Sequence, residues 1–151
     1  MSHSVDYYHL EYLPTPPLLC GTVVRPLTDA EYTGVFELQL TEALHHRCPW
    51  WLLDGRADGP PRSAQLYEWL QDDLLPRAHR GLFQQPTVAF IALPAFWQEL
   101  KSRRLIPNII FAGTFRRGWF TNEATARAWL ARCRADSPPP PLPGLQPEQP
   151  R

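Results

Sequence analysis

Alternation of apolar and polar positions predicts two strands at the start of the chain. Residues Tyr7–Leu13 alternate and are rich in aromatic side chains, and Leu18–Arg25 is a second run of strand type. Proline cannot donate to a strand ladder, so Pro14–Pro17 is expected to form the turn between them. Because this connection is short, the two strands are expected to be antiparallel neighbours.

A four-residue apolar period predicts a helix after Thr28. Thr28 and Glu31 have the spacing of a capping box, in which each residue satisfies a backbone N–H of the other. The apolar stripe of this helix is formed by Tyr32, Phe36, Leu40 and Leu44. Further helices are expected at residues 63–75, where Pro76 should end or kink the helix, at 95–103, and from 121 or 122 onward.

Short continuous apolar runs predict strands that are buried on both faces, as in parallel sheets. These runs are Trp50–Leu53, Thr87–Leu93 and Ile109–Phe115. The expected order is β-β-α-β-α-β-α-β-α, an α/β fold with a mostly parallel sheet flanked by helices. It forms a single domain over residues 1–136. In residues 137–151, seven of fifteen residues are proline, so this segment is expected to be a disordered tail.

Composition narrows the classes of function. Lys+Arg and Asp+Glu are both 15, so the chain has no net charge that would attract nucleic acid. Its three cysteines indicate no disulfide framework. We find no signal peptide and no apolar run near the roughly 20 residues that span a bilayer, so we expect a cytoplasmic protein without membrane insertion. Lys101 is the only lysine among the 15 basic residues, which indicates a GC-rich genome, and we expect a bacterial one.

The loop after Trp50–Leu53 is the first candidate binding or switch site. Ligands of α/β sheets usually meet the loops at the carboxyl ends of the strands. The candidate residues are Asp54, Gly55, Arg56, Asp58 and Ser63. The alternative is structural: Asp54 accepts hydrogen bonds from loop N–H groups, Arg56 pairs with a neighbouring acid, and Ser63 is an ordinary helix N-cap.

Arginine pairs around Ile109–Phe115 form a second candidate, for an anion. They are Arg103, Arg104, Arg116 and Arg117. The alternative is a solvated basic rim. His45, His46 and Cys48 lack the second set of ligands that a zinc site needs, so no metal or other cofactor is expected. Most tryptophans are expected in the core, and Trp119 is expected to be the most exposed because it lies in a loop-like stretch.

Five segments in sequence order carry a family resemblance. They are EYTGVFELQLTEAL, CPWWLLDGR, LYEWLQDDLLPR, VAFIALP and FTNEATARAWL, spread over residues 7–134. In this order they resemble small bacterial SpoIIAA-like proteins of the STAS (anti-sigma-factor antagonist) superfamily. The resemblance implies a non-enzymatic interaction domain, switched by phosphorylation at the start of the helix after the central strand. Ser63 holds that place here, but the family's usual Asp-Ser-Ser/Thr-Gly segment is not present.

Three functions remain open from the sequence. The first is a non-enzymatic regulatory or protein-interaction module of the STAS type, with an unknown protein partner and a homodimer left open. The second is a protein that binds a small apolar or anionic ligand, which a closed pocket lined by Trp or Tyr would favour. The third is an enzyme that uses Asp54 with a distant histidine, and this requires hydrogen-bond contact between the two.

Overall fold

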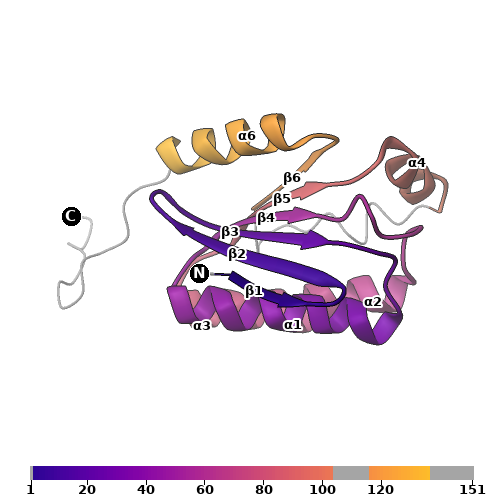
Figure 1. Ribbon diagram of the computed structural model, residues 1–151, viewed down its shortest axis with the longest axis horizontal. Helices are drawn as coiled ribbons and strands as arrows, with labels where there is room; N and C mark the ends of the chain where they lie inside the picture. Colours follow the sequence, from indigo (N-terminus) through magenta and orange to yellow (C-terminus); the bar gives the residue numbers. More distant parts are fainter. Residues whose placement is uncertain (1, 104–115, 137–151) are drawn as a thin grey trace, which may run out of the picture.

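Backbone hydrogen bonds join six strands into one sheet, with the strands side by side in sequence order (Figure 1). The computed structural model describes residues 2–103 and 116–136. The strands are Ser2–Val5 (β1), Tyr8–Pro14 (β2), Pro17–Val23 (β3), Trp50–Asp54 (β4), Thr87–Ile91 (β5) and Arg116–Phe120 (β6).

The sheet is antiparallel at its amino-terminal side and parallel elsewhere. β2 pairs antiparallel with both β1 and β3, whereas β3, β4, β5 and β6 pair in parallel. The α/β class and the mostly parallel sheet are therefore confirmed, as is the antiparallel pairing of the two predicted first strands. The strand Ser2–Val5 was not predicted, and it covers the edge that β2 would otherwise expose.

Helical segments cover both faces of the sheet. They are Asp29–His46 (α1), Ala64–Trp69 (α2), the π-helical Leu70–Leu74 (η1), Leu75–Leu82 (α3), Pro94–Ser102 (α4) and Glu123–Asp136 (α6). Figure 1 shows α1, α2 and α3 on one face and α6 on the other, with α4 near the carboxyl ends of the parallel strands. Within residues 2–103 and 116–136, no helix is long and apolar enough to cross a membrane.

The capping box predicted at the start of α1 is present. Thr28 Oγ1 accepts a hydrogen bond from the Glu31 N–H at 3.1 Å, and Glu31 Oε1 accepts one from the Thr28 N–H at 2.9 Å. Phe36 and Leu40 of the predicted stripe are buried, whereas Leu44 at its end is 39% exposed. The helix ends at Arg47, which has a left-handed backbone.

The sequence predicted that the second helix ends or kinks at Pro76. The helix does not end there, because helical structure continues to Leu82. Pro76 lies in the first turn of α3, directly after the π-helical turn η1. There the Leu75 N–H donates to the carbonyl of Leu70, five residues earlier. We attribute the continuation to this wider turn, because it shifts the carbonyl groups that a proline ring would otherwise strike.

The strand β6 lies where the sequence predicted a loop. Arg117 pairs with Val88 of β5, and Trp119 pairs with Phe90. Trp119 is partly buried and stacks on Phe90, so its predicted placement in a loop was wrong. The predicted strand Ile109–Phe115 and the proline-rich tail lie outside the described residues.

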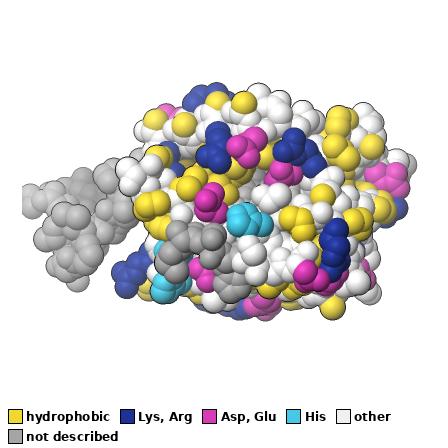
Figure 2. Space-filling view, viewed as in Figure 1, with side chains coloured by type: hydrophobic (Ala, Val, Ile, Leu, Met, Phe, Trp, Pro, Cys, Tyr) yellow, Lys and Arg dark blue, Asp and Glu magenta, His cyan; other side chains and the backbone are white. Residues whose placement is uncertain are grey.

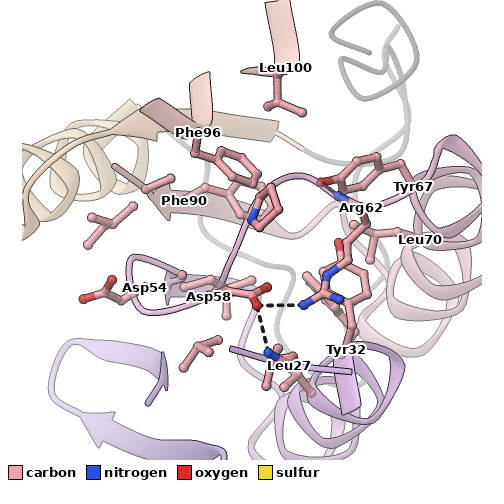
Figure 3. A pocket seen from close by; sticks show the side chains of 18 of the residues that line it. Leu27, Tyr32, Asp54, Asp58, Arg62, Tyr67, Leu70, Phe90, Phe96 and Leu100 are labelled. Carbon is pink, nitrogen blue, oxygen red and sulfur yellow. Dashed lines mark hydrogen bonds and ion pairs between the residues drawn. The ribbon is translucent and has the colours of Figure 1, made fainter. Parts of the chain in front are cut away.

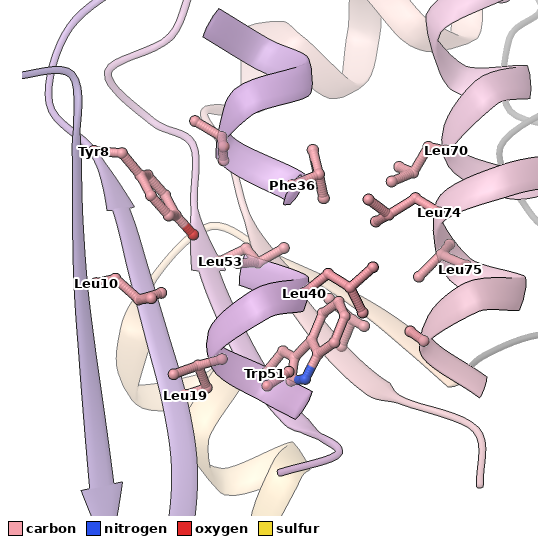
Figure 4. Close-up of a cluster of buried hydrophobic side chains, with 14 of the residues drawn as sticks. Tyr8, Leu10, Leu19, Phe36, Leu40, Trp51, Leu53, Leu70, Leu74 and Leu75 are labelled. Atoms are coloured by element: carbon pink, nitrogen blue, oxygen red, sulfur yellow. The ribbon is translucent and has the colours of Figure 1, made fainter. Parts of the chain in front are cut away.

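Two hydrophobic cores fill the two faces of the sheet. The broad-face core lies between the sheet and α1, α2, η1 and α3, and it includes Trp51, Leu53 and Val88 (Figure 4). The narrow-face core lies under α6, and its buried residues are Leu18, Leu52, Ala89, Ile91, Ala126 and Leu130. Neighbouring residues of β4 and β5 alternate between the two cores, as side chains of a strand must.

Candidate functional site

A cavity of about 110 Å³ lies in the broad face, at the carboxyl ends of β4 and β5 (Figure 3). Its walls come from every layer of that face: the strands β2 to β6, the first turns of α1, the helices α2 and α4, and the loop after β4. Its aromatic lining includes Tyr32, Tyr67, Phe90, Phe96, Trp97 and Trp119. This is the edge where α/β proteins usually bind ligands.

The aromatic rings of the lining hold one another in place. Phe90 and Trp119 stack across β5 and β6, with ring centroids 4.7 Å apart and planes 23° apart. Trp97 on α4 meets the Trp119 ring edge-on at 4.7 Å. On the opposite wall, Tyr32 of α1 meets Tyr67 of α2 edge-on at 6.3 Å. The contacts fix the walls, since offset and edge-on arrangements are the favoured geometries of aromatic pairs.

Asp54 and Arg56 of the predicted loop form a closed local pair. Asp54 Oδ1 accepts hydrogen bonds from the Arg56 backbone N–H at 3.1 Å and from its Nε at 3.0 Å, and Asp54 Oδ2 accepts from Nη2 at 2.7 Å. This is the structural alternative that the sequence left open. Among the described residues, no histidine is hydrogen-bonded to Asp54, which is the contact that the enzyme hypothesis requires.

Asp58 anchors the loop to the rest of the fold. Its Oδ1 accepts hydrogen bonds from the N–H groups of Leu27 at 3.0 Å and Gly59 at 2.8 Å. The same oxygen accepts from Arg62 Nη2 at 2.7 Å, and this ion pair lies at the rim of the cavity (Figure 3). Burial opposes the charge of Arg62, but its hydrogen bonds to carboxylates outweigh burial, so the pKa of its guanidinium is raised.

Ser63 stands at the start of α2 as an exposed N-cap. Its Oγ accepts a hydrogen bond from the Leu66 N–H at 3.4 Å, a long distance for such a bond. The geometry therefore matches the structural alternative for Ser63. The side chain is also accessible to solvent, as a modified residue would have to be.

A second hollow, of about 260 Å³, lies on the other side of the same loop. It is bounded by the loop after β4 and by the first turns of α4, and Leu93 at its edge is 50% exposed. Gly55, Asp58, Pro60 and Phe96 line both hollows, so they form the wall between them.

The three candidate arginines that the structure describes do not converge on one point. Arg103 Nη1 donates to the carbonyl of Pro61 at 3.1 Å, near the carboxyl ends of the strands. Arg116 begins β6 at the opposite end, where its Nε donates to Thr87 Oγ1 at 3.0 Å. Arg117 is the next residue on that strand, so its side chain leaves on the other face of the sheet. Arg104 lies outside the described residues.

Burial shifts the pKa values of two tyrosines of the cavity and of the three cysteines elsewhere in the fold. Burial raises the pKa of Tyr67 to about 12 and that of Tyr32 well above its usual range, so both phenols stay neutral at pH 7. Burial also raises the pKa of Cys48 to about 11, and those of Cys20 and Cys133 above their usual values. Across the described ranges, no three His, Cys, Asp or Glu side chains are grouped to hold a metal ion.

The aromatic residues of the cavity are the part that sequence reasoning missed. Phe96 and Trp97 follow β5 just as the predicted loop follows β4, so both segments leave the same edge of a parallel sheet. That shared placement is a signal that the sequence contains. The tyrosines of α1 and α2 carried no such signal, because their apolar spacing indicates only a buried helix face.

Comparisons with known proteins provide no identity for the chain. No family model, no curated protein and no solved structure matches it. The resemblance to the STAS superfamily therefore stays a prediction, and the function has to be argued from the geometry.

Proposed function

We propose that this protein is a non-enzymatic binding protein whose ligand is a small apolar molecule held in the aromatic cavity. The observation that carries the proposal is the cavity itself, at the carboxyl ends of β4 and β5 and lined by tyrosine, phenylalanine and tryptophan. Apolar pockets with a few polar groups at the rim are the usual form of small-molecule sites.

The size of the cavity limits the ligand. A dry apolar cavity of about 150 Å³ is large enough to bind benzene. The cavity here, of about 110 Å³, is smaller than that, so it suits a ligand with no more than one ring or a short branched chain. Empty apolar space is unfavourable because its wall atoms lack contacts on one side, and a ligand restores those contacts.

Titration with toluene tests this proposal directly. Trp97 and Trp119 line the cavity, so a bound ring should change the tryptophan fluorescence of the full chain. Toluene should also raise the melting temperature in proportion to its occupancy, because it binds only the folded state. A titration without saturable change in either signal would refute the proposal.

A matched pair of substitutions locates the binding. Leu27 lines the cavity and is 8% exposed, so Leu27→Phe should fill the space and abolish the toluene response. Leu93 borders the second hollow but not the cavity, so Leu93→Phe makes the same chemical change elsewhere and should leave the response intact. If only Leu93→Phe loses the response to toluene, the binding site is the second hollow and not the cavity.

The loop Asp54–Ser63 supports a second candidate function, the regulatory or protein-interaction module of the STAS type. The observation in its favour is the second hollow, where the exposed Arg56 and the half-exposed Leu93 offer a charged and an apolar contact. Arg56→Ala should weaken capture of a protein partner from the native host, with Arg80→Ala on α3 as a control far from the loop. Equal capture by both variants would show that the loop is only a connector.

A further inference from the structure

Two side chains that line the cavity carry N–H donors that have no acceptor among the described residues. Arg62 Nε and Trp97 Nε1 are both buried, and neither has a hydrogen-bond partner within residues 2–103 and 116–136. Buried donors are nearly always hydrogen-bonded in native proteins, so each unpaired donor calls for an explanation. Both donors belong to side chains that line the same small cavity.

The donor on Arg62 is left over after its other contacts are made. Its Nη2 donates to Asp58 at 2.7 Å and its Nη1 to Asp29 at 3.2 Å. The guanidinium lies over the Tyr32 ring, 5.3 Å from the ring centroid. A guanidinium is planar and its donors point in fixed directions, so these contacts also fix the direction of Nε on a side chain that lines the cavity (Figure 3).

The indole that carries the Trp97 donor packs against two other aromatic rings. Its indole meets the rings of Phe96 and Trp119 edge-on, with centroid distances of 5.0 and 4.7 Å. The face of an aromatic ring is a weak acceptor compared with an oxygen atom. An acceptor oxygen inside the cavity would therefore satisfy this donor better than its present neighbours do.

The charges at the rim are already neutralised. Asp58 pairs with Arg62, and Asp54 pairs with Arg56, so each acid in the lining has a cationic partner. Acidic and basic side chains also lie next to one another on the face of the molecule shown in Figure 2. An anionic ligand would have to compete with these carboxylates, and burying a charge without its own partner is costly.

We infer that the ligand is a small neutral molecule with one apolar ring and one oxygen acceptor, such as an aryl ketone or an aryl ester. The ring fills the aromatic cavity, and the oxygen accepts a hydrogen bond from Trp97 Nε1 or Arg62 Nε. This inference rests on the proposed function and narrows it, because it favours a ligand with an oxygen acceptor over pure hydrocarbons and over the anionic ligands that the sequence left open.

The experiment compares three probes of similar size: acetophenone, ethylbenzene and benzoate. Their dissociation constants are measured by tryptophan fluorescence on the full chain and on Trp97→Phe and Arg62→Lys. Trp97→Phe keeps an aromatic ring and removes the indole N–H. Arg62→Lys keeps the charge and removes the guanidinium Nε–H together with the two Nη groups that bind Asp29 and Asp58. In at least one variant, acetophenone should bind about tenfold more weakly, as expected for the loss of one hydrogen bond. Ethylbenzene should change by no more than about twofold in that variant, since it makes no hydrogen bond.

Each outcome bears on a different claim. If both variants weaken acetophenone and ethylbenzene by the same factor, or weaken neither, the donors do not contact the ligand and the inference fails while the proposed function stands. If benzoate binds more tightly than acetophenone, the assignment of a neutral ligand fails. If neither acetophenone nor ethylbenzene binds the unmodified chain, the inference and the proposed function fail together. Circular dichroism melting confirms that each variant is folded.

Discussion

The two faces of the sheet are packed with side chains of different size. The broad-face core gathers long aliphatic and aromatic side chains from several helical segments, and Trp51 at its centre is fully buried. The narrow-face core has one helix, α6, and its contacts include the small residues Ala89 and Ala126. A Cβ on Gly118 would lie 2.6 Å from the Phe120 ring, so this glycine lets that ring cover the strand closely.

This difference explains why the cavity lies on the broad face. Small side chains let a single helix approach a sheet closely and fill its surface. Large rings carried by α1, α2 and α4 meet at different angles at the carboxyl ends of the strands, and rigid rings cannot all interdigitate there. The cavity thus forms on the face where these aromatic rings meet.

The largest expected effect is the loss of Trp51 from the broad-face core. Its side chain is fully buried, and its Nε1 donates to the Cys48 carbonyl at 2.8 Å. Trp51→Ala should lower the free energy of unfolding by about 3–5 kcal/mol. Leu130→Ala in the narrow-face core should cost about 2–3 kcal/mol, because less volume is removed there. Urea unfolding followed by circular dichroism measures the free energy of unfolding of both variants. Equal decreases in the two variants would show that the two cores do not differ in their contribution to stability.

The buried pair Tyr8 and Gln39 gives the next largest effect. The Tyr8 hydroxyl donates to Gln39 Oε1 at 2.8 Å, and Gln39 is fully buried. Tyr8→Phe leaves that oxygen without a donor and should cost about 1–3 kcal/mol. The double variant Tyr8→Phe with Gln39→Leu removes both polar partners and should recover most of the loss. If the double variant is less stable than Tyr8→Phe, the two side chains stabilise the fold by more than the hydrogen bond they make to each other.

Elements with strong local signals were predictable from the sequence. The start of α1 was found because Thr28 and Glu31 contact each other within one turn, which needs no information from the rest of the chain. The run Trp50–Leu53 was found because a strand covered on both faces must be apolar throughout. These signals gave the α/β class and the loop at the carboxyl end of β4.

Features that depend on distant contacts were not predictable. β6 reads RRGWF, which has no strand pattern, and it is a strand because it pairs with β5. Pro76 indicated the end of a helix, and the π-helical turn that accommodates it has no sequence signature. The cavity joins Tyr32, Tyr67 and Trp97 from three separate helices, so only the folded chain shows that they face one another.

Removing a helix cap should lower the free energy of unfolding by less than these core substitutions, and by different amounts on the two faces. Asn122 Oδ1 accepts a hydrogen bond from the Thr125 N–H at 2.9 Å and caps α6 on the narrow face. Ser63 Oγ accepts from Leu66 at 3.4 Å and caps α2 beside the cavity. Asn122→Ala should therefore cost about 1 kcal/mol, and Ser63→Ala only about 0.5 kcal/mol. Thermal unfolding ranks the two variants, and the reverse order would show that the cavity edge is the more tightly held region.

The smallest expected effect is a pH dependence at the start of α1, next to the cavity. Hydrogen bonds from Arg25 and from the Thr28 backbone lower the pKa of Glu31 to about 2. A carboxylate with a lowered pKa in the folded state stabilises the fold above its unfolded pKa, and this stabilisation is lost as the pH falls towards 2. Glu31→Gln should therefore flatten the fall in melting temperature between about pH 4.5 and pH 2.

Arg25→Met provides the control for this pH effect, because it removes the same ion pair from the other side. Arg25 Nη2 lies 2.7 Å from Glu31 Oε2, so without it the carboxylate keeps the hydrogen bond from Thr28 but loses its charged partner. The acid curve of Arg25→Met should then fall between those of the unmodified chain and Glu31→Gln. An acid curve of Glu31→Gln that overlays that of the unmodified chain would contradict the prediction, and acid would then act on the broad face through other carboxylates.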